Sequence, residues 1–150
     1  MDRVAQIVAE LQIAYATQLE IVQSYLADAS NLEGADTVKE LLDQEALSAF
    51  GYARRIAKRI RALQGRVPRS SDLSKSPGDG QQSFDSTSMQ SVLLSALKTA
   101  DDVIGQYQRL IQLCDGNDFV TLDLIIELLV AERDRRRAIT DSMARMTHSR

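Results

Sequence analysis

The chain has 150 residues, a formal net charge of −3 and one cysteine, Cys114. This length predicts one domain with its own hydrophobic core. The charge balance provides no basic field for nucleic acid, and a single cysteine cannot form an intramolecular disulfide. No apolar run is long enough to span a membrane and no signal-peptide pattern opens the chain, so we expect a cytoplasmic protein.

Two amphipathic helices are predicted in the first half of the chain. Apolar residues recur at three- and four-residue spacing over about 4–30 and again over about 37–64. Gly34 tolerates the left-handed backbone that ends helices, and Asp36 is placed to cap the second helix. Gly65 is expected to end that second helix.

A polar segment, 66–88, separates this first pair of helices from a second pair. It shows no apolar periodicity and is rich in turn-forming residues. A loop of this length is explained by a crossover along a bundle, which makes the second and third helices parallel. The third and fourth helices are predicted at about 89–113 and 118–146, with a short turn between them.

Four helices joined by a short, a long and a short loop predict an all-α four-helix bundle with one crossover. We expect a single domain over 1–150, made of helical hairpins at about 4–65 and 89–147. The hairpins share features, because Tyr25 near the end of the first helix has a counterpart, Tyr107, near the end of the third. This likeness favours an internal duplication.

Most of the chain resembles the ferritin-like superfamily, closest to the bacterioferritin type. The resemblance covers 11–34, 41–68 and 100–139, and its best local matches are 53–65 and 118–132. It implies a bundle with a di-metal centre in its core. One glutamate comes from each of the first and third helices, and a Glu-x-x-His pair from each of the others.

The residues at the matching ligand positions depart from that pattern. They are, in chain order, Gln18, Ala49, Tyr52, Thr99 (or Ala100 after a one-residue shift), Glu132 and Arg135. Only Glu132 keeps the family's ligand type, and the other residues cannot replace carboxylates and imidazoles around two metal ions. The haem-binding methionine of bacterioferritins corresponds to Phe50, and the only histidine is His148. A single-metal site at Glu45 and Glu132 stays open, without support from a histidine.

A buried polar cluster is predicted in place of the metal. Glu132 stands at the midpoint of the apolar stripe of the fourth helix, where a carboxylate needs a partner. In a one-crossover bundle, Arg135 and Glu45 are displaced the same way along the axis, so we expect Glu45, Glu132 and Arg135 to meet. Gln18 or Tyr52 is expected to give Glu132 a further hydrogen bond. The alternative is that Arg135 points to solvent with its neighbouring arginines.

We therefore predict a non-catalytic ferritin-like protein that acts as an interaction or assembly subunit, as a homodimer or larger homo-oligomer or with a protein partner. No catalytic residue, metal or other cofactor is expected. The alternative is an iron-storage or iron-oxidising protein, or a subunit that co-assembles with an active one, with iron as the cofactor. A third class is a nucleic-acid-associated bundle resembling the miniferritins, against which the acidic balance argues.

Overall fold

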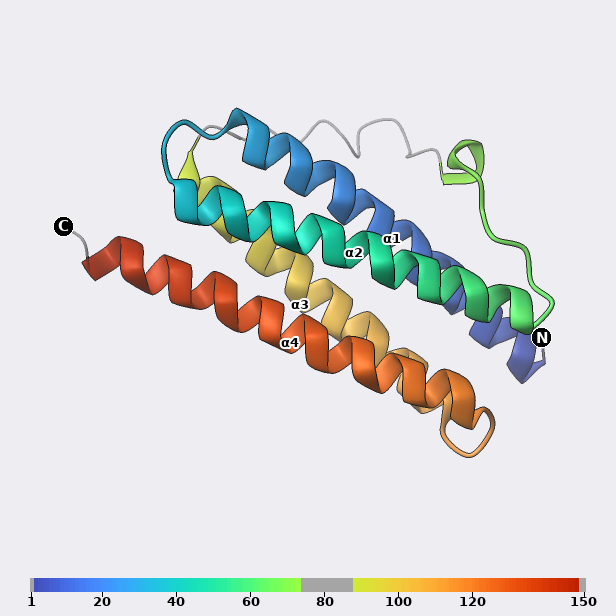
Figure 1. Ribbon diagram of the computed structural model, residues 1–150. Helices are drawn as coiled ribbons and strands as arrows, with labels where there is room; N and C mark the ends of the chain where they lie inside the picture. Colours follow the sequence, from blue (N-terminus) through green and yellow to red (C-terminus); the bar gives the residue numbers. More distant parts are fainter. Residues whose placement is uncertain (1, 74–87, 149–150) are drawn as a thin grey trace.

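The computed structural model describes residues 2–73 and 88–148. Within these residues the chain forms four long α-helices and one short 3-10 helix (Figure 1). The elements are α1 (Arg3–Asn31), α2 (Asp36–Ala62), η1 (Ser70–Leu73), α3 (Met89–Cys114) and α4 (Phe119–His148).

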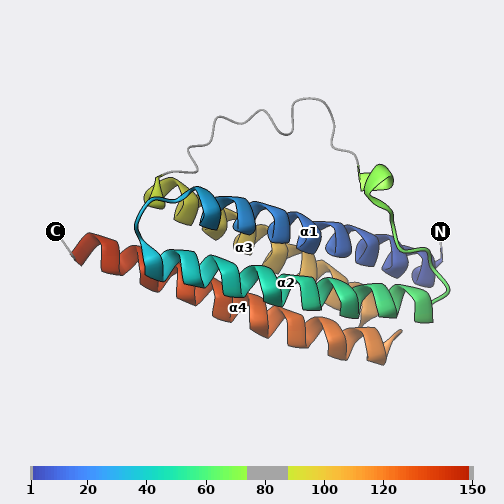
Figure 2. The same ribbon diagram turned by 45° about the horizontal axis from the view of Figure 1, so that its top comes forward.

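The four helices lie side by side as one bundle. Figures 1 and 2 show α1 and α4 running in one direction and α2 and α3 in the other. The most extensive packing is within each hairpin, α1 against α2 and α3 against α4. Because α2 and α3 are parallel, the last residues of α2 and the first residues of α3 lie at opposite ends of the bundle. The predicted all-α four-helix fold with one crossover is confirmed.

The helix ends follow local backbone chemistry. The side chain of Asp2 caps α1 by accepting a hydrogen bond from the Ala5 amide at 2.7 Å. Gly34 and Ala35 both adopt left-handed backbone, with φ of 71° and 53°, in the turn before α2. The prediction that Asp36 caps α2 is wrong. The left-handed residue Ala35 holds the cap position without a side-chain hydrogen bond, so Asp36 is already the first helical residue.

The crossover contains structure that its composition does not indicate. Residues Ser70–Leu73 form η1, in a segment predicted to be irregular. Asp72 organises this turn, because its carboxylate accepts hydrogen bonds from the Arg69 amide at 2.8 Å and from Arg66 at 2.9 Å. The remainder of the predicted crossover, 74–87, lies outside the described residues.

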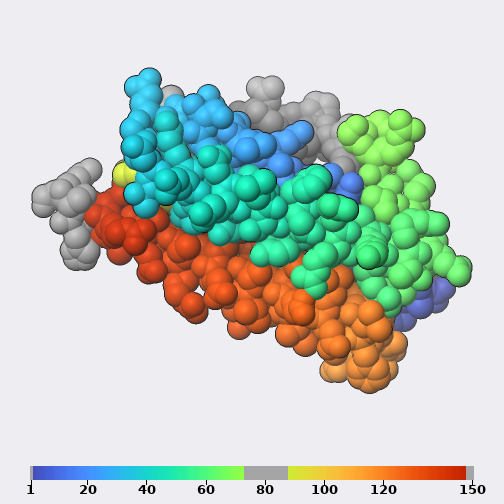
Figure 3. Space-filling view, in the orientation of Figure 1, coloured from blue at the N-terminus to red at the C-terminus, as the bar shows by residue number. Residues whose placement is uncertain are grey.

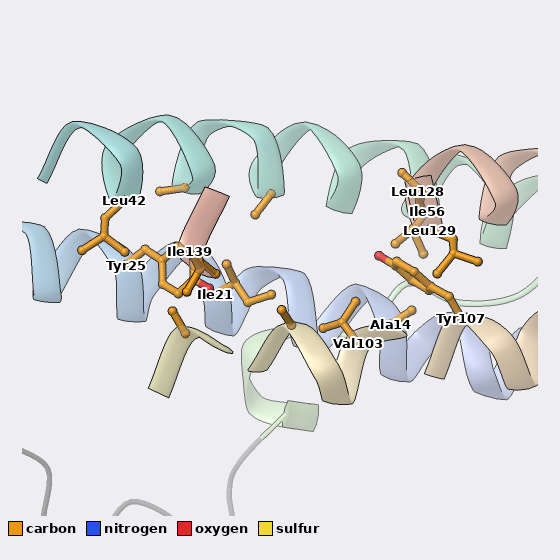
Figure 4. Close-up of a cluster of buried hydrophobic side chains, with 14 of the residues drawn as sticks. Ala14, Ile21, Tyr25, Leu42, Ile56, Val103, Tyr107, Leu128, Leu129 and Ile139 are labelled. Carbon is orange, nitrogen blue, oxygen red and sulfur yellow. The ribbon is translucent and has the colours of Figure 1, made fainter. Parts of the chain in front are cut away.

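Apolar side chains from all four helices form the core. Figure 4 shows a cluster of them, which includes the two buried tyrosines Tyr25 and Tyr107. The hairpin closes tightly at Gly65, where an added Cβ would lie only 2.6 Å from a methyl carbon of Val8. The core is therefore continuous along the bundle, and any polar group inside it needs a partner from another side chain.

Candidate functional site

The candidate site is a buried ion cluster between α2 and α4. Arg135 on α4 is the largest fully buried side chain in the described part of the chain. Its Nε donates a hydrogen bond to Glu45 Oε2 on α2 at 2.7 Å, and its Nη1 lies 3.1 Å from Glu132 Oε1. The structure therefore brings together Glu45, Glu132 and Arg135, and Arg135 does not point to solvent.

Two tyrosine rings complete the surroundings of the guanidinium. The Cζ atom of Arg135 lies 5.9 Å from the ring centre of Tyr25 on α1 and 6.0 Å from that of Tyr52 on α2. An arginine cation at this distance is attracted by the negative face of an aromatic ring. Tyr52 thus serves the cluster through its ring.

Gln18 takes a different partner from the one expected. Its side-chain amide donates a hydrogen bond of 2.8 Å to the Tyr107 hydroxyl on α3. The expectation that Gln18 or Tyr52 donates to Glu132 is wrong. Glu132 Oε2 has no hydrogen-bond partner among the described residues, and neither have the Tyr25 hydroxyl and Gln18 Oε1. The polar interior is therefore only partly satisfied.

The charges in this interior do not balance when both carboxyl groups are ionised, because they share one guanidinium. Burial raises the pKa of Glu132 to about 7, against the lowering effect of Arg135, and the nearby Glu45 raises it further. Burial lowers the pKa of Arg135, but Glu132, Tyr25 and Glu45 outweigh that effect, so Arg135 stays charged. Burial also raises the pKa of Tyr25 and of Tyr107.

The other ligand-matching positions lie around this cluster without adding donors for a metal. Ala49 is fully buried in the apolar core. Thr99 lines a cleft of about 350 Å³ between α1 and α3, whereas its neighbour Ala100 is the one buried in the core. Phe50, which the resemblance aligns with the haem-binding methionine, is 51% exposed on the outside of α2.

The donor set is poor in metal ligands. Within residues 2–73 and 88–148, no group of three or more histidine, cysteine, aspartate or glutamate side chains is placed to hold a metal ion. Glu45 and Glu132, the pair considered for a single-metal site, both face the Arg135 guanidinium. A positive charge between two carboxylates opposes the binding of a further cation there.

A second polar cluster, which the sequence pattern did not single out, ties α2 to the start of α4. Arg59 forms an ion pair of 3.0 Å with Asp118 and donates a hydrogen bond of 2.8 Å to the Thr121 hydroxyl. Asp118 caps α4 by accepting from the Thr121 amide at 3.0 Å. Burial opposes ionisation of Asp118, but these hydrogen bonds and the Arg59 charge outweigh it and lower its pKa. The cap is a sequence signal, since aspartate precedes the helix by one residue.

No helix in the described residues combines the length and apolar character needed to cross a membrane.

Solved structures of similar fold include several bacterioferritins. Desulfovibrio desulfuricans bacterioferritin, solved in different states of its diiron site, matches 98% of this chain and 83% of its own, with 19% identity and a TM-score of 0.84. Rhodobacter capsulatus bacterioferritin, with a metal-free dinuclear site and haem iron, covers 99% and 88% with 18% identity and a TM-score of 0.83.

The bacterioferritin-related protein of Bacteroides fragilis, described as a dodecameric thioferritin, is 25% identical. The match covers 99% of this chain and 92% of that one, with a TM-score of 0.83. No curated protein sequence matches the chain. The model of the ferritin family, the Ferritin-like domain, matches residues 8–147, so the predicted resemblance is confirmed and the chain belongs to this family.

Proposed function

We propose that this chain is a non-catalytic ferritin-like protein of the cytoplasm, in which a buried ion cluster takes the place of the family's di-metal centre. It acts through its surface, as an interaction or assembly subunit.

The observation that carries this proposal is the position of Arg135. Its side chain is 1% exposed and contacts Glu132, the one matching position that retains a carboxylate. A guanidinium does not lose its proton in proteins, so this positive charge is permanent. A pair of divalent cations would have to share the same carboxylate with it, at a Coulombic cost that grows in the low dielectric of a bundle core.

The chemistry of the other donors supports the same proposal. Gln18 uses its amide to hydrogen-bond Tyr107, Ala49 has no donor atom, and Tyr52 faces the guanidinium with its ring. Iron pairs in such bundles need several carboxylates and imidazoles at one level. We therefore infer that the residues present do not fit a di-metal centre, and we assign no redox step to them.

Assembly into a homo-oligomer is the second part of the proposal. The similar Bacteroides fragilis protein is described as dodecameric. Ten large apolar side chains in the described residues are more than 40% exposed, Leu47 and Phe119 most of all. Contacts between copies of the chain would remove such surface from water.

Metal analysis tests the catalytic half of the proposal. Protein purified from iron-supplemented cells should contain far less than one iron per chain and should not accelerate ferrous oxidation. The variant Glu132→Ala, purified in parallel, should give the same iron content, because Glu132 is assigned no metal. A bacterioferritin carried through the same procedure shows that the growth and purification preserve bound iron.

The alternative is an iron-storing or iron-oxidising protein, or a subunit that co-assembles with an active one. It predicts a different result in the same metal analysis. About two irons per chain with saturable ferrous oxidation, both lost in Glu132→Ala, would establish a di-iron site and overturn the proposal.

A further inference from the structure

The cleft of about 350 Å³ between α1 and α3 has a polar lining of one sign of charge. It contains hydroxyl groups, among them those of Ser24 and Thr99, and three carboxylates, Glu20, Asp28 and Asp102. No lysine, arginine or histidine of the described residues lines it. Figure 3 shows the face formed by α2 and α4, on which α3 is almost entirely hidden, so the cleft is not part of that face. We call it the α1–α3 cleft.

Asp28 is the most buried of these carboxylates. The residue is only 8% exposed, and in the described residues its carboxylate takes part in no ion pair. Burial raises the pKa of Asp28, and no positive charge among the described residues offsets that rise. Buried charges in proteins are normally paired. The partner of Asp28 is therefore to be sought outside these residues, and the cleft that Asp28 lines gives access to it.

Tyr25 provides a second observation on the same wall of the cleft. It lies one helical turn before Asp28, lines the cleft and is 3% exposed. Its hydroxyl has no hydrogen-bond partner among the described residues. The wall of the α1–α3 cleft thus contains a buried charge and a buried hydroxyl whose bonding capacity the described residues leave unused.

The carboxylates of Asp28 and Asp102 lie toward opposite ends of the cleft. Because α1 and α3 are antiparallel, Asp28, the last lining residue of α1, lies near the level of Ser95, the first lining residue of α3. Asp102 follows Ser95 by seven positions, which corresponds to roughly 10 Å along the helix. The hydroxyls of Ser24 and Thr99 belong to the stretch between the two carboxylates.

This separation decides the chemical class of the ligand. A divalent cation needs several oxygen ligands that converge on one point. No group of three histidine, cysteine, aspartate or glutamate side chains in the described residues does so. A linear polyamine instead carries its positive charges at intervals along an aliphatic chain. Its terminal ammonium groups can each bind one of two distant carboxylates, and its methylene groups can pack on an apolar residue such as Ile21, which also lines the cleft.

We propose that the α1–α3 cleft binds a linear aliphatic polyamine of about the length of spermidine. One terminal ammonium group donates to Asp28 and the other to Asp102, as charge-assisted hydrogen bonds. The inner amine donates to the hydroxyls of Ser24 and Thr99. The ligand thereby supplies the positive charge that the lining lacks.

This inference goes beyond the proposed function and does not depend on it. The cleft would bind a polyamine whether or not the bundle holds iron and whether or not the chain assembles. Metal analysis and the binding experiment below therefore fail or succeed separately.

Isothermal titration calorimetry with the full chain tests the proposal. At an ionic strength of about 0.1 M, which screens general attraction to an acidic protein, we expect saturable binding of one spermidine per chain. Asp28→Asn keeps the size of the side chain and removes its charge, so the dissociation constant should rise on the order of 10- to 100-fold. Asp102→Asn should raise it about 3-fold, because this side chain is exposed and its ion pair is weaker.

Asp43→Asn on α2 is the matched control. It removes the same charge from an exposed position outside the cleft, so spermidine should bind this variant like the native chain. Spermidine should also raise the melting temperature of the native chain and of Asp43→Asn, but not that of Asp28→Asn. Because Asp102→Asn changes an exposed residue, it tests the cleft even if Asp28→Asn fails to fold.

A series of smaller probes tests the assigned ligand class. Affinity should fall from spermidine to putrescine and again to butylamine, which has a single ammonium group. Magnesium at millimolar concentration should not displace spermidine. The proposal would be overturned by the absence of saturable binding, by equal losses in Asp43→Asn and the two cleft variants, or by butylamine or magnesium binding as tightly as spermidine.

Discussion

Tyr25 in the α1–α2 hairpin and Tyr107 in the α3–α4 hairpin are counterparts, and both are almost completely buried. The Tyr107 hydroxyl accepts a hydrogen bond from Gln18, seven residues before Tyr25. The Tyr25 hydroxyl has no partner among the described residues. The counterpart of Gln18, seven residues before Tyr107, is Ala100, which has no side-chain donor. One substitution at an equivalent position thus leaves one tyrosine satisfied and the other not.

A second difference concerns the charges. The pair Ala49 and Tyr52 on α2 corresponds to Glu132 and Arg135 on α4, with the same three-residue interval. Only the second hairpin therefore carries a buried ion pair. Arg135 of this pair also binds Glu45 of the first hairpin. The comparison teaches that the two hairpins share their apolar pattern and differ in their polar interior. Partners for the buried polar groups come from the opposite hairpin as well as from their own.

The largest effect is expected from removal of the central cation. Arg135→Ala leaves the buried Glu132 and the partly buried Glu45 without their shared partner. The free energy of unfolding should fall by about 3–5 kcal/mol, as for other broken buried ion pairs. Urea denaturation measures this change.

The matched control is Arg137→Ala, two residues along the same helix. Arg137 is paired with Asp134 at 3.3 Å on the surface, with side chains that are 71% and 63% exposed. Its removal should change the free energy of unfolding by less than about 0.5 kcal/mol. Equal losses for the two variants would refute a special role for Arg135 in the core.

The next effect depends on pH and isolates Glu132. Its pKa in the folded protein is raised from 4.5 to about 7, so the folded state holds this proton more tightly than the unfolded chain does. The stability of the native protein relative to Glu132→Gln should therefore fall as the pH rises from about 4.5 to about 7, and should level off above that. We expect a total change on the order of 1–3 kcal/mol.

Thermal or urea unfolding of both proteins at a series of pH values provides the measurement. Other titrating groups are common to the two proteins, so their contributions cancel in the difference. A difference that stays constant across this range would mean that Glu132 ionises normally in the folded state.

The smallest effect bears directly on the tyrosine comparison. Tyr107→Phe removes the acceptor of the buried Gln18 amide, which should cost about 1–2 kcal/mol. Tyr25→Phe removes a buried hydroxyl without a partner, and should be neutral or slightly stabilising. Calorimetry of the two variants under identical conditions measures both changes in stability. The variants are matched, because each substitution removes a single hydroxyl oxygen. If both variants lose the same stability, the hydroxyls are equivalent and the inferred asymmetry between the hairpins is wrong.

Much of this molecule follows from its sequence. The spacing of apolar residues determines four amphipathic helices, and the loop lengths determine that α2 and α3 are parallel. The prediction that Gln18, Ala49 and Arg135 depart from the ligand pattern of the resembled family rests on residue identity and needs no coordinates. The contact between Arg135 and Glu45 could be predicted from the helix directions alone. Relative to Glu132, both residues are displaced in the same direction along the bundle axis.

The tertiary structure decided the contacts that depend on how each helix is rotated about its own axis. The periodicity of apolar residues defines the inward face of a helix only to within one residue. It therefore did not decide whether Thr99 or Ala100 faces the core, and in the packed bundle Ala100 is the buried residue. Gln18 donates its hydrogen bond to Tyr107 and not to Glu132, and Arg59 pairs with Asp118. Each of these two pairs joins residues more than fifty positions apart in the chain. Such pairings depend on distances of a few ångströms between helices, and only the packing of the whole core specifies those distances.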